Sequence, residues 1–97
     1  MSEFAPTRTL VLYEYVPDIL ERRAPHRDDH LARLRAWADE GRLIAAGALG
    51  DPPSGAAIVL SVPVEEAERM TADDPYVRAG LVTAIRIEPW NVVVRQS

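Results

Sequence analysis

The order of the periodic segments constrains the fold of this chain more than any other feature of its sequence. Residues 8–16 (RTLVLYEYV) are rich in β-branched and aromatic residues and end at a proline, which predicts a strand. Residues 25–40 carry apolar side chains at helical spacing, and Gly41 follows them as a typical helix stop. These apolar side chains are Leu31, Leu34, Trp37 and Ala38. The first half of the chain therefore predicts one strand and one main helix, with a short helical turn at residues 17–23 between them.

The second half of the chain adds a hairpin to this alternation. Residues 42–49 and 55–62 are apolar, strand-like runs joined by the turn sequence GDPPS, so they should pair antiparallel. Residues 63–73 begin with proline and have glutamates in the first turn, which predicts a second helix that residues 74–81 (DPYVRAGL) interrupt. Residues 82–94 form a long last strand, bent or broken at its proline. The whole order is β-α-β-β-α-β.

This order is typical of the ferredoxin-like α+β fold, a four-stranded antiparallel sheet with both helices on one face. The other face then needs a cover. We expect Tyr13, Tyr15, Val92 and Val94 to lie on it, which makes it too apolar for contact with solvent. A second copy of the chain is the simplest cover, so we predict a homodimer whose two sheets enclose a shared core, with Trp90 near the interface.

Length and charge limit the kinds of partner that the chain can have. Its 97 residues suffice for one domain, residues 1–97, and a net charge of -4 gives no electrostatic reason to bind nucleic acid or an anionic membrane. The apolar runs are far shorter than the roughly 20 residues of a membrane-spanning helix, and residues 1–9 lack the pattern of a signal peptide. We therefore expect a cytoplasmic protein that binds a small molecule, with neither nucleic acid nor membrane as a partner.

The absence of two residue types narrows the possible chemistry. The chain has no cysteine, and its basic residues other than histidine are all arginine, so thiolate and lysine Schiff-base catalysis are excluded. Ser54 and Ser61 lie outside any nucleophile-elbow motif, which argues against a serine nucleophile. Histidine and carboxylates remain as the candidates for proton transfer.

Both histidines of the chain, His26 and His30, stand four residues apart at the start of the main predicted helix. On a helix this spacing puts two side chains on one face, where they could hold a metal ion with a third ligand from Asp29 or Asp74. No second metal signature appears in the sequence, so we predict no metal and no cofactor. The alternative reading of His26 is a solvated residue of the first helical turn.

Three short motifs follow one another along the chain. They are R-x-x-H-L at residues 27–31, G-x-L-x-x-x-G at residues 41–47 and D-P-Y at residues 74–76. Together they resemble the YCII-related (YciI-like) family, whose members are small dimeric α+β-barrel proteins related in fold to muconolactone isomerase. The resemblance covers nearly the whole chain. It departs from the family pattern at Ala48, where many members have proline, and in the short loop at residues 51–55.

The resemblance implies a site made by His30 and Asp74. A carboxylate bonded to an imidazole fixes its tautomer and favours its charged form, which suits a general acid or base near pH 7. We therefore expect the two side chains to lie within hydrogen-bond reach, although they are far apart in the sequence. Asp74 could equally be the N-cap of the following turn, with Pro75 at the first position, and the two roles are compatible.

Four further residues are candidates for contact with a substrate: Arg27, His26, Tyr76 and Pro75. Tyr76 either lines the cleft or packs in the core, and Arg27 either binds an anionic substrate or pairs with a surface carboxylate. The leading hypothesis is a lyase or isomerase-type enzyme in which His30 moves a proton on a small metabolite while Asp74 orients the ring. One alternative is a non-catalytic small-ligand-binding or accessory module that uses the same cleft, and another is a purely structural dimer.

Overall fold

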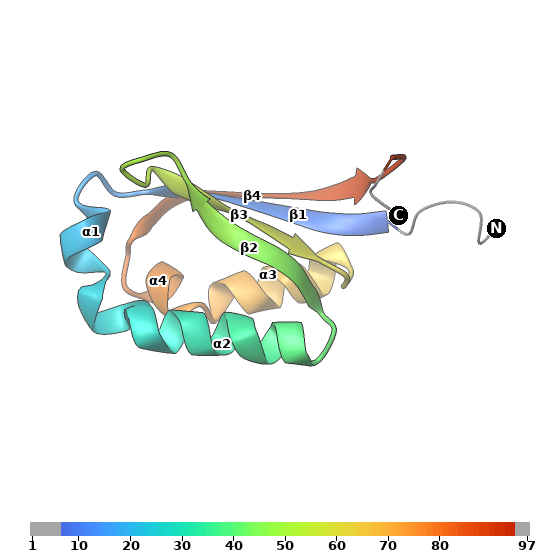
Figure 1. Ribbon diagram of the computed structural model, residues 1–97, viewed down its shortest axis with the longest axis horizontal. Helices are drawn as coiled ribbons and strands as arrows, with labels where there is room; N and C mark the ends of the chain where they lie inside the picture. The colour runs from blue at the N-terminus through green and yellow to red at the C-terminus, as the bar shows by residue number, and fades with distance from the viewer. Residues whose placement is uncertain (1–6, 95–97) are drawn as a thin grey trace.

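The computed structural model describes residues 7–94 and has a four-stranded sheet with its helices on one face (Figure 1). The strands are β1 (Thr7–Tyr15), β2 (Leu43–Leu49), β3 (Gly55–Leu60) and β4 (Val82–Asn91). The helices are α1 (Ile19–Arg22), α2 (Arg27–Asp39), α3 (Val64–Ala72) and α4 (Pro75–Arg78), with a 3-10 turn, η1, at Ala24–His26. The α+β class and the β-α-β-β-α-β order of the longer elements are as predicted.

The sheet is antiparallel throughout, with the strand order β2-β3-β1-β4. β1 therefore lies in the interior of the sheet, between the second strand of the hairpin and the last strand of the chain. The core between sheet and helices contains buried side chains of β1, β3 and α3: Val11, Tyr13, Ala56, Ile58, Leu60, Ala67 and Met70. This order brings the first strand beside the segments that follow α3, which is where the candidate site forms.

The side of β1 that faces the helices differs from our prediction. We expected Tyr13 and Tyr15 on the open face of the sheet, and this is wrong, because Tyr13 is only 2% exposed and Tyr15 packs against the same core. Side chains alternate along a strand, so the open face carries Leu10 and Leu12 instead. The face with Leu10 and Leu12 also carries the charged side chains of Arg8 and Glu14, which was the available signal that this face lies away from the helices.

The ends of two elements also differ from the prediction. α2 begins at Arg27, because Ala24–His26 forms a separate 3-10 turn. The helix ends as predicted before Gly41, whose φ of 78° is the left-handed conformation that glycine adopts most easily. β4 stops before Val92 and Val94, which therefore follow the sheet.

None of the helices within residues 7–94 has the length and apolar character needed to cross a bilayer.

α2 buries little apolar surface against the sheet. The buried residue of this helix is His30, whereas Leu31, Leu34 and Trp37 are half-buried. Ala38, which we expected on the core-facing side, is exposed. Leu34 and Trp37 pack against the core from α2, and the hydrogen bond of His30 to Asp74 adds a buried polar contact to this packing.

Candidate functional site

The buried carboxylate of Asp74 is the centre of a hydrogen-bonded cluster on the helix side of the sheet. Asp74 is 3% exposed. His30 donates from Nδ1 to Oδ1 at 2.7 Å, and the Tyr13 hydroxyl donates to Oδ2 at 2.7 Å. The backbone N–H of Tyr76 donates to Oδ1 at 2.9 Å. These donors belong to α2, β1 and α4, so one side chain joins three elements. The predicted contact between His30 and Asp74 is confirmed.

The D-P-Y sequence explains how Asp74 is positioned. A residue before proline is kept out of helical geometry, and Asp74 is extended, with a ψ of 127°. Pro75 takes the first position of α4, and Asp74 caps this helix by accepting the N–H of Tyr76. Oδ1 accepts from both Tyr76 and His30. The two roles predicted for Asp74, helix cap and histidine partner, therefore occur together.

The imidazole of His30 is held in one tautomer and one plane. An ionised carboxylate can only accept hydrogen bonds, so the Nδ1 that contacts Asp74 carries a proton. The ring stacks on Tyr76, with centroids 3.7 Å apart and planes 4° apart. Nε2 has no hydrogen-bond partner within residues 7–94. In the neutral ring, Nε2 is therefore a free lone pair that can take a proton.

Tyr13 belongs to this cluster, although the sequence analysis did not place it there. Burial, and then the negative charge of Asp74, raise the pKa of the Tyr13 hydroxyl far above its ordinary value, so it stays a protonated donor. The pKa of Tyr15 is raised to about 12, first by burial and then by the nearby Tyr76 and Asp74. A buried tyrosine hydroxyl usually has a hydrogen-bond partner, which is the only hint that the sequence offered for Tyr13. This hint does not say that the partner is Asp74.

A cavity of about 260 Å³, here called the inner cavity, lies between α2 and the strands β2 and β3. His30 and Tyr76 line it, together with the two arginines Arg23 and Arg27. The rest of the wall consists of small or aliphatic residues: Leu31, Leu34, Ala46, Gly47, Ala48, Ala56 and Ile58. The fold therefore brings three of the predicted residues, His30, Arg27 and Tyr76, to one cavity. Arg23 was not among the candidates.

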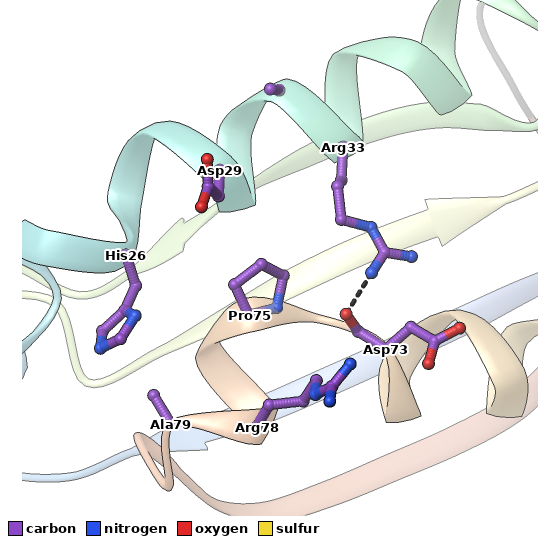
Figure 2. A pocket seen from close by; sticks show the side chains of 8 residues that line it. His26, Asp29, Arg33, Asp73, Pro75, Arg78 and Ala79 are labelled. Carbon is purple, nitrogen blue, oxygen red and sulfur yellow. Dashed lines mark hydrogen bonds between the residues drawn. The ribbon is translucent and has the colours of Figure 1, made fainter.

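Besides Asp74, two predicted residues remain, and they line a separate, more open hollow between α2 and α4, here called the outer groove (Figure 2). His26 and Pro75 lie here, and the Arg33 guanidinium donates a hydrogen bond to the backbone carbonyl of Asp73. His26 and His30 line different hollows because His26 ends the 3-10 turn and precedes α2. The two histidines are therefore not placed one turn apart on the same face of one α-helix, as the sequence spacing had suggested.

The possible metal ligands are dispersed. Within residues 7–94, no three side chains of histidine, aspartate or glutamate are grouped as metal ligands would be. Of the two third ligands considered from the sequence, Asp29 lines the outer groove with His26, whereas Asp74 accepts three hydrogen bonds from the protein beside the inner cavity. The feature that these residues do form is the hydrogen-bonded pair of histidine and aspartate.

Known proteins resemble this chain in sequence and in fold. The family model of the YCII-related domain matches residues 7–91. Protein YciI of Escherichia coli O6:H1 is 37% identical over 86 residues, which cover 78% of this chain and 88% of that protein. An uncharacterised protein of Haemophilus influenzae is 33% identical over 94 residues, which cover 87% of this chain and 96% of that protein.

One solved structure has a similar fold at low sequence identity. It is the 5-chloro-2-hydroxyhydroquinone dehydrochlorinase of Burkholderia phenoliruptrix, in complex with 2,5-dihydroxybenzoquinone. The TM-score is 0.73 at 22% identity, and the match covers 86% of this chain and 92% of that one. The likeness supports the α+β fold with its four-stranded antiparallel sheet.

The buried Tyr13 hydroxyl makes stability depend on pH in the alkaline range. In the unfolded chain a tyrosine loses its proton near its ordinary pKa of 10.0, whereas folded Tyr13 keeps its proton to a higher pH. The stabilisation from neutral Tyr13 is therefore fully present below about pH 10 and is lost as the pH rises from there toward the folded pKa. Urea unfolding between pH 8 and pH 11 should show a fall of up to about 1.4 kcal/mol per pH unit from this group.

The substitution Tyr13→Phe is the matched variant for this prediction. Its free energy of unfolding should be lower at neutral pH by about 1–3 kcal/mol, because Asp74 loses a donor. Above pH 10 its decline should be shallower than that of the wild type by up to about 1.4 kcal/mol per pH unit. The chain has no lysine to titrate in the same range. Equal slopes in the two proteins would show that Tyr13 is not held neutral by the fold.

Proposed function

The chain belongs to the YCII-related domain family, and from this membership and the buried His30–Asp74 pair we propose that it is an acid–base enzyme of the lyase or isomerase type. Its substrate is a small metabolite bound in the inner cavity. His30 moves a proton on this substrate, and Asp74 orients the imidazole and stabilises its charged form. We propose no cofactor for this reaction.

The observation that carries the proposal is the orientation of His30. Nδ1 is bonded to Asp74 at 2.7 Å, and Nε2 has no partner within residues 7–94, although the side chain is almost fully buried. His30 is among the residues that line the inner cavity, and Nε2 is not one of the fully buried atoms that lack a hydrogen-bond partner, so this nitrogen is accessible. A base oriented by a carboxylate at the wall of a cavity is the arrangement by which general acid–base enzymes position their proton acceptor.

The proposed step is proton abstraction from carbon. Nε2 of neutral His30 takes a proton from a carbon next to a carbonyl or an equivalent activating group, and the electron pair of the broken C–H bond remains on the substrate. In an isomerisation the imidazolium returns the proton to another atom of the substrate. In an elimination the electron pair expels a leaving group, and the imidazolium gives its proton to that group or to water. The negative charge of Asp74 favours the imidazolium formed between the two transfers.

The dehydrochlorinase of similar fold supports the lyase branch of this proposal. Its name describes the removal of hydrogen chloride from a hydroxylated ring. At 22% identity the likeness does not identify the substrate of this chain. It provides one compound, 5-chloro-2-hydroxyhydroquinone, that belongs in the first panel of substrates to be tested.

The proposal can be tested through exchange with deuterium, because abstraction of a proton in D₂O replaces it even when no product accumulates. A panel of small carbon acids, with keto acids, unsaturated acids and 5-chloro-2-hydroxyhydroquinone, would be followed by NMR and mass spectrometry. We expect exchange or product formation above the uncatalysed rate for at least one compound. In His30→Asn the rate should fall by at least about 100-fold, since general acid–base catalysis contributes about that much or more.

Two further variants make this experiment specific. Asp74→Asn should lower the rate as well, because it removes the charge that favours the imidazolium. Asp28→Asn is the matched control, since Asp28 is an exposed aspartate of α2 outside both hollows, and it should keep the wild-type rate. Equal exchange by the wild type and a folded His30→Asn would rule out the proposed base. Ligand binding without exchange across the whole panel would favour the non-catalytic binding module.

We also propose a homodimer formed through the open face of the sheet. By register, this face carries Leu10 and Leu12 of β1, Ala57 and Val59 of β3, and Trp90 of β4, which is 43% exposed. It also carries the exposed ion pair of Arg86 and Glu88, which lie opposite Leu12 and Leu10 on β4. The proposal rests on the apolar patch of β1 and β3, which a monomer would leave partly exposed. A second copy of the chain, related by a two-fold axis, would cover this face with an identical one.

Sedimentation equilibrium tests the homodimer. At tens of micromolar we expect the mass of a dimer. The substitution Val59→Glu should shift the equilibrium toward monomer, because it would bury a carboxylate in the interface between the apolar neighbours Leu10 and Ala45. Leu20→Glu is the control on the helix side, at a leucine of α1 that is 51% exposed, and it should leave the dimer intact. A wild-type protein that sediments as a monomer would contradict the proposal.

A further inference from the structure

Apart from the phenol of Tyr76, the ionisable groups that line the inner cavity are basic. Arg23 and Arg27 line it together with His30, and none of the described residues that line it is acidic. Neither arginine forms an ion pair within residues 7–94. The whole chain has 15 acidic and 11 basic residues, so two unneutralised guanidiniums beside one cavity are a local exception to its net negative charge. The planar guanidinium group is well suited to bind an anionic oxygen.

The arginines and the histidine that line the cavity differ in their exposure to solvent. Arg27 is exposed and Arg23 is half-buried, so charge is available near the solvent side. His30 is 7% exposed and contributes an unpartnered ring nitrogen. Its ring lies flat against Tyr76, so the two form a planar stack at the wall. Two kinds of polar group therefore line the cavity: the guanidinium groups of Arg23 and Arg27 on one part of its wall, and the imidazole of His30 on another.

The size of the cavity follows from the small residues of β2. Ala46 and Ala48 lie opposite Ile58 and Ala56 of β3, so their side chains are on the face of the sheet toward α2. Larger side chains at these two positions would fill the space below α2. A cavity of about 150 Å³ is enough to hold benzene. At about 260 Å³ the inner cavity has room for one ring with substituents, or for a chain of similar size.

We infer that the inner cavity binds a small organic anion about the size of one substituted ring, with its carboxylate or ionised hydroxyl group at Arg23 and Arg27. The apolar part of the ligand lies between α2 and the alanines of β2, within reach of His30. This inference rests on the proposed function, because it names the class of substrate on which His30 would act. It can be tested separately, since it requires binding and not turnover.

The probes are three compounds of nearly the same shape and different charge: benzoate, benzamide and benzamidine. Each would be titrated into the ¹⁵N-labelled chain while amide shifts are followed by NMR. We expect benzoate to shift the amides of Leu31, Ala46 and their neighbours, and to bind at least about tenfold more tightly than neutral benzamide. Cationic benzamidine should bind no better than benzamide.

Two variants and a control locate the binding. The double variant Arg23→Gln/Arg27→Gln should weaken benzoate binding by at least about tenfold and leave benzamide unchanged. Ala46→Leu should weaken the binding of both, because it fills the cavity without removing a charge. Arg35→Gln is the control, at an exposed arginine of α2 that lines none of the hollows described above, and it should bind benzoate like the wild type. The NMR spectrum of each variant also reports whether it is folded.

The outcomes separate this inference from the proposed function. Benzoate that fails to bind, that binds no better than benzamidine, or that binds equally to the double arginine variant would overturn the inference. The proposed function would still stand if deuterium exchange on another class of compound depended on His30. Conversely, selective benzoate binding together with exchange that is unaffected by His30→Asn would overturn the proposed function and leave the anion site in place.

Discussion

The buried carboxylate of Asp74 is the interaction on which the rest of this structure depends. A carboxylate taken out of water is costly unless it is hydrogen-bonded, and here both oxygens are supplied by donors from three elements. Tyr13 contributes from the interior strand β1, His30 from α2 and the Tyr76 backbone from α4. Removal of any one donor would leave part of a buried charge unsatisfied. The same network that fixes the helices relative to the sheet therefore also fixes the imidazole.

The packing of α2 combines apolar contacts with the hydrogen bond of His30. The helix has a thin apolar stripe, and its buried residue is His30. It faces a strand whose inward side chains at Ala46 and Ala48 are small. Leu34 and Trp37 hold the helix against the core, and the small side chains of β2 leave the inner cavity beside them. The hydrogen bond to Asp74 then fixes the imidazole of His30 at the wall of this cavity.

Much of this arrangement could be predicted from the sequence, and the exceptions have physical reasons. Periodicity predicted the order of strands and helices, and the D-P-Y motif predicted the helix cap, whereas Asp74 as the partner of His30 came from the resemblance to the YCII-related family. The burial of Tyr13 was missed although Arg8 and Glu14 mark the other side of β1 as the outer one, and its hydrogen bond to Asp74 depends on the packing of β1 against the segment after α3. His26 was grouped with His30 because the sequence does not show where a 3-10 turn gives way to an α-helix. Arg23 reaches the inner cavity only through the path of the chain before α2.

The central claim is that Asp74 holds His30 with the proton on Nδ1 and the lone pair on Nε2. Long-range ¹H–¹⁵N NMR of the imidazole in its neutral form tests this claim most directly, because the two ring nitrogens differ widely in chemical shift according to which one is protonated. We predict the Nδ1-protonated tautomer for His30 in the wild type. In Asp74→Asn, which removes the charged acceptor, this preference should be reduced or lost. A wild-type His30 that carries its proton on Nε2, with Nδ1 unprotonated beside the carboxylate, would contradict the account.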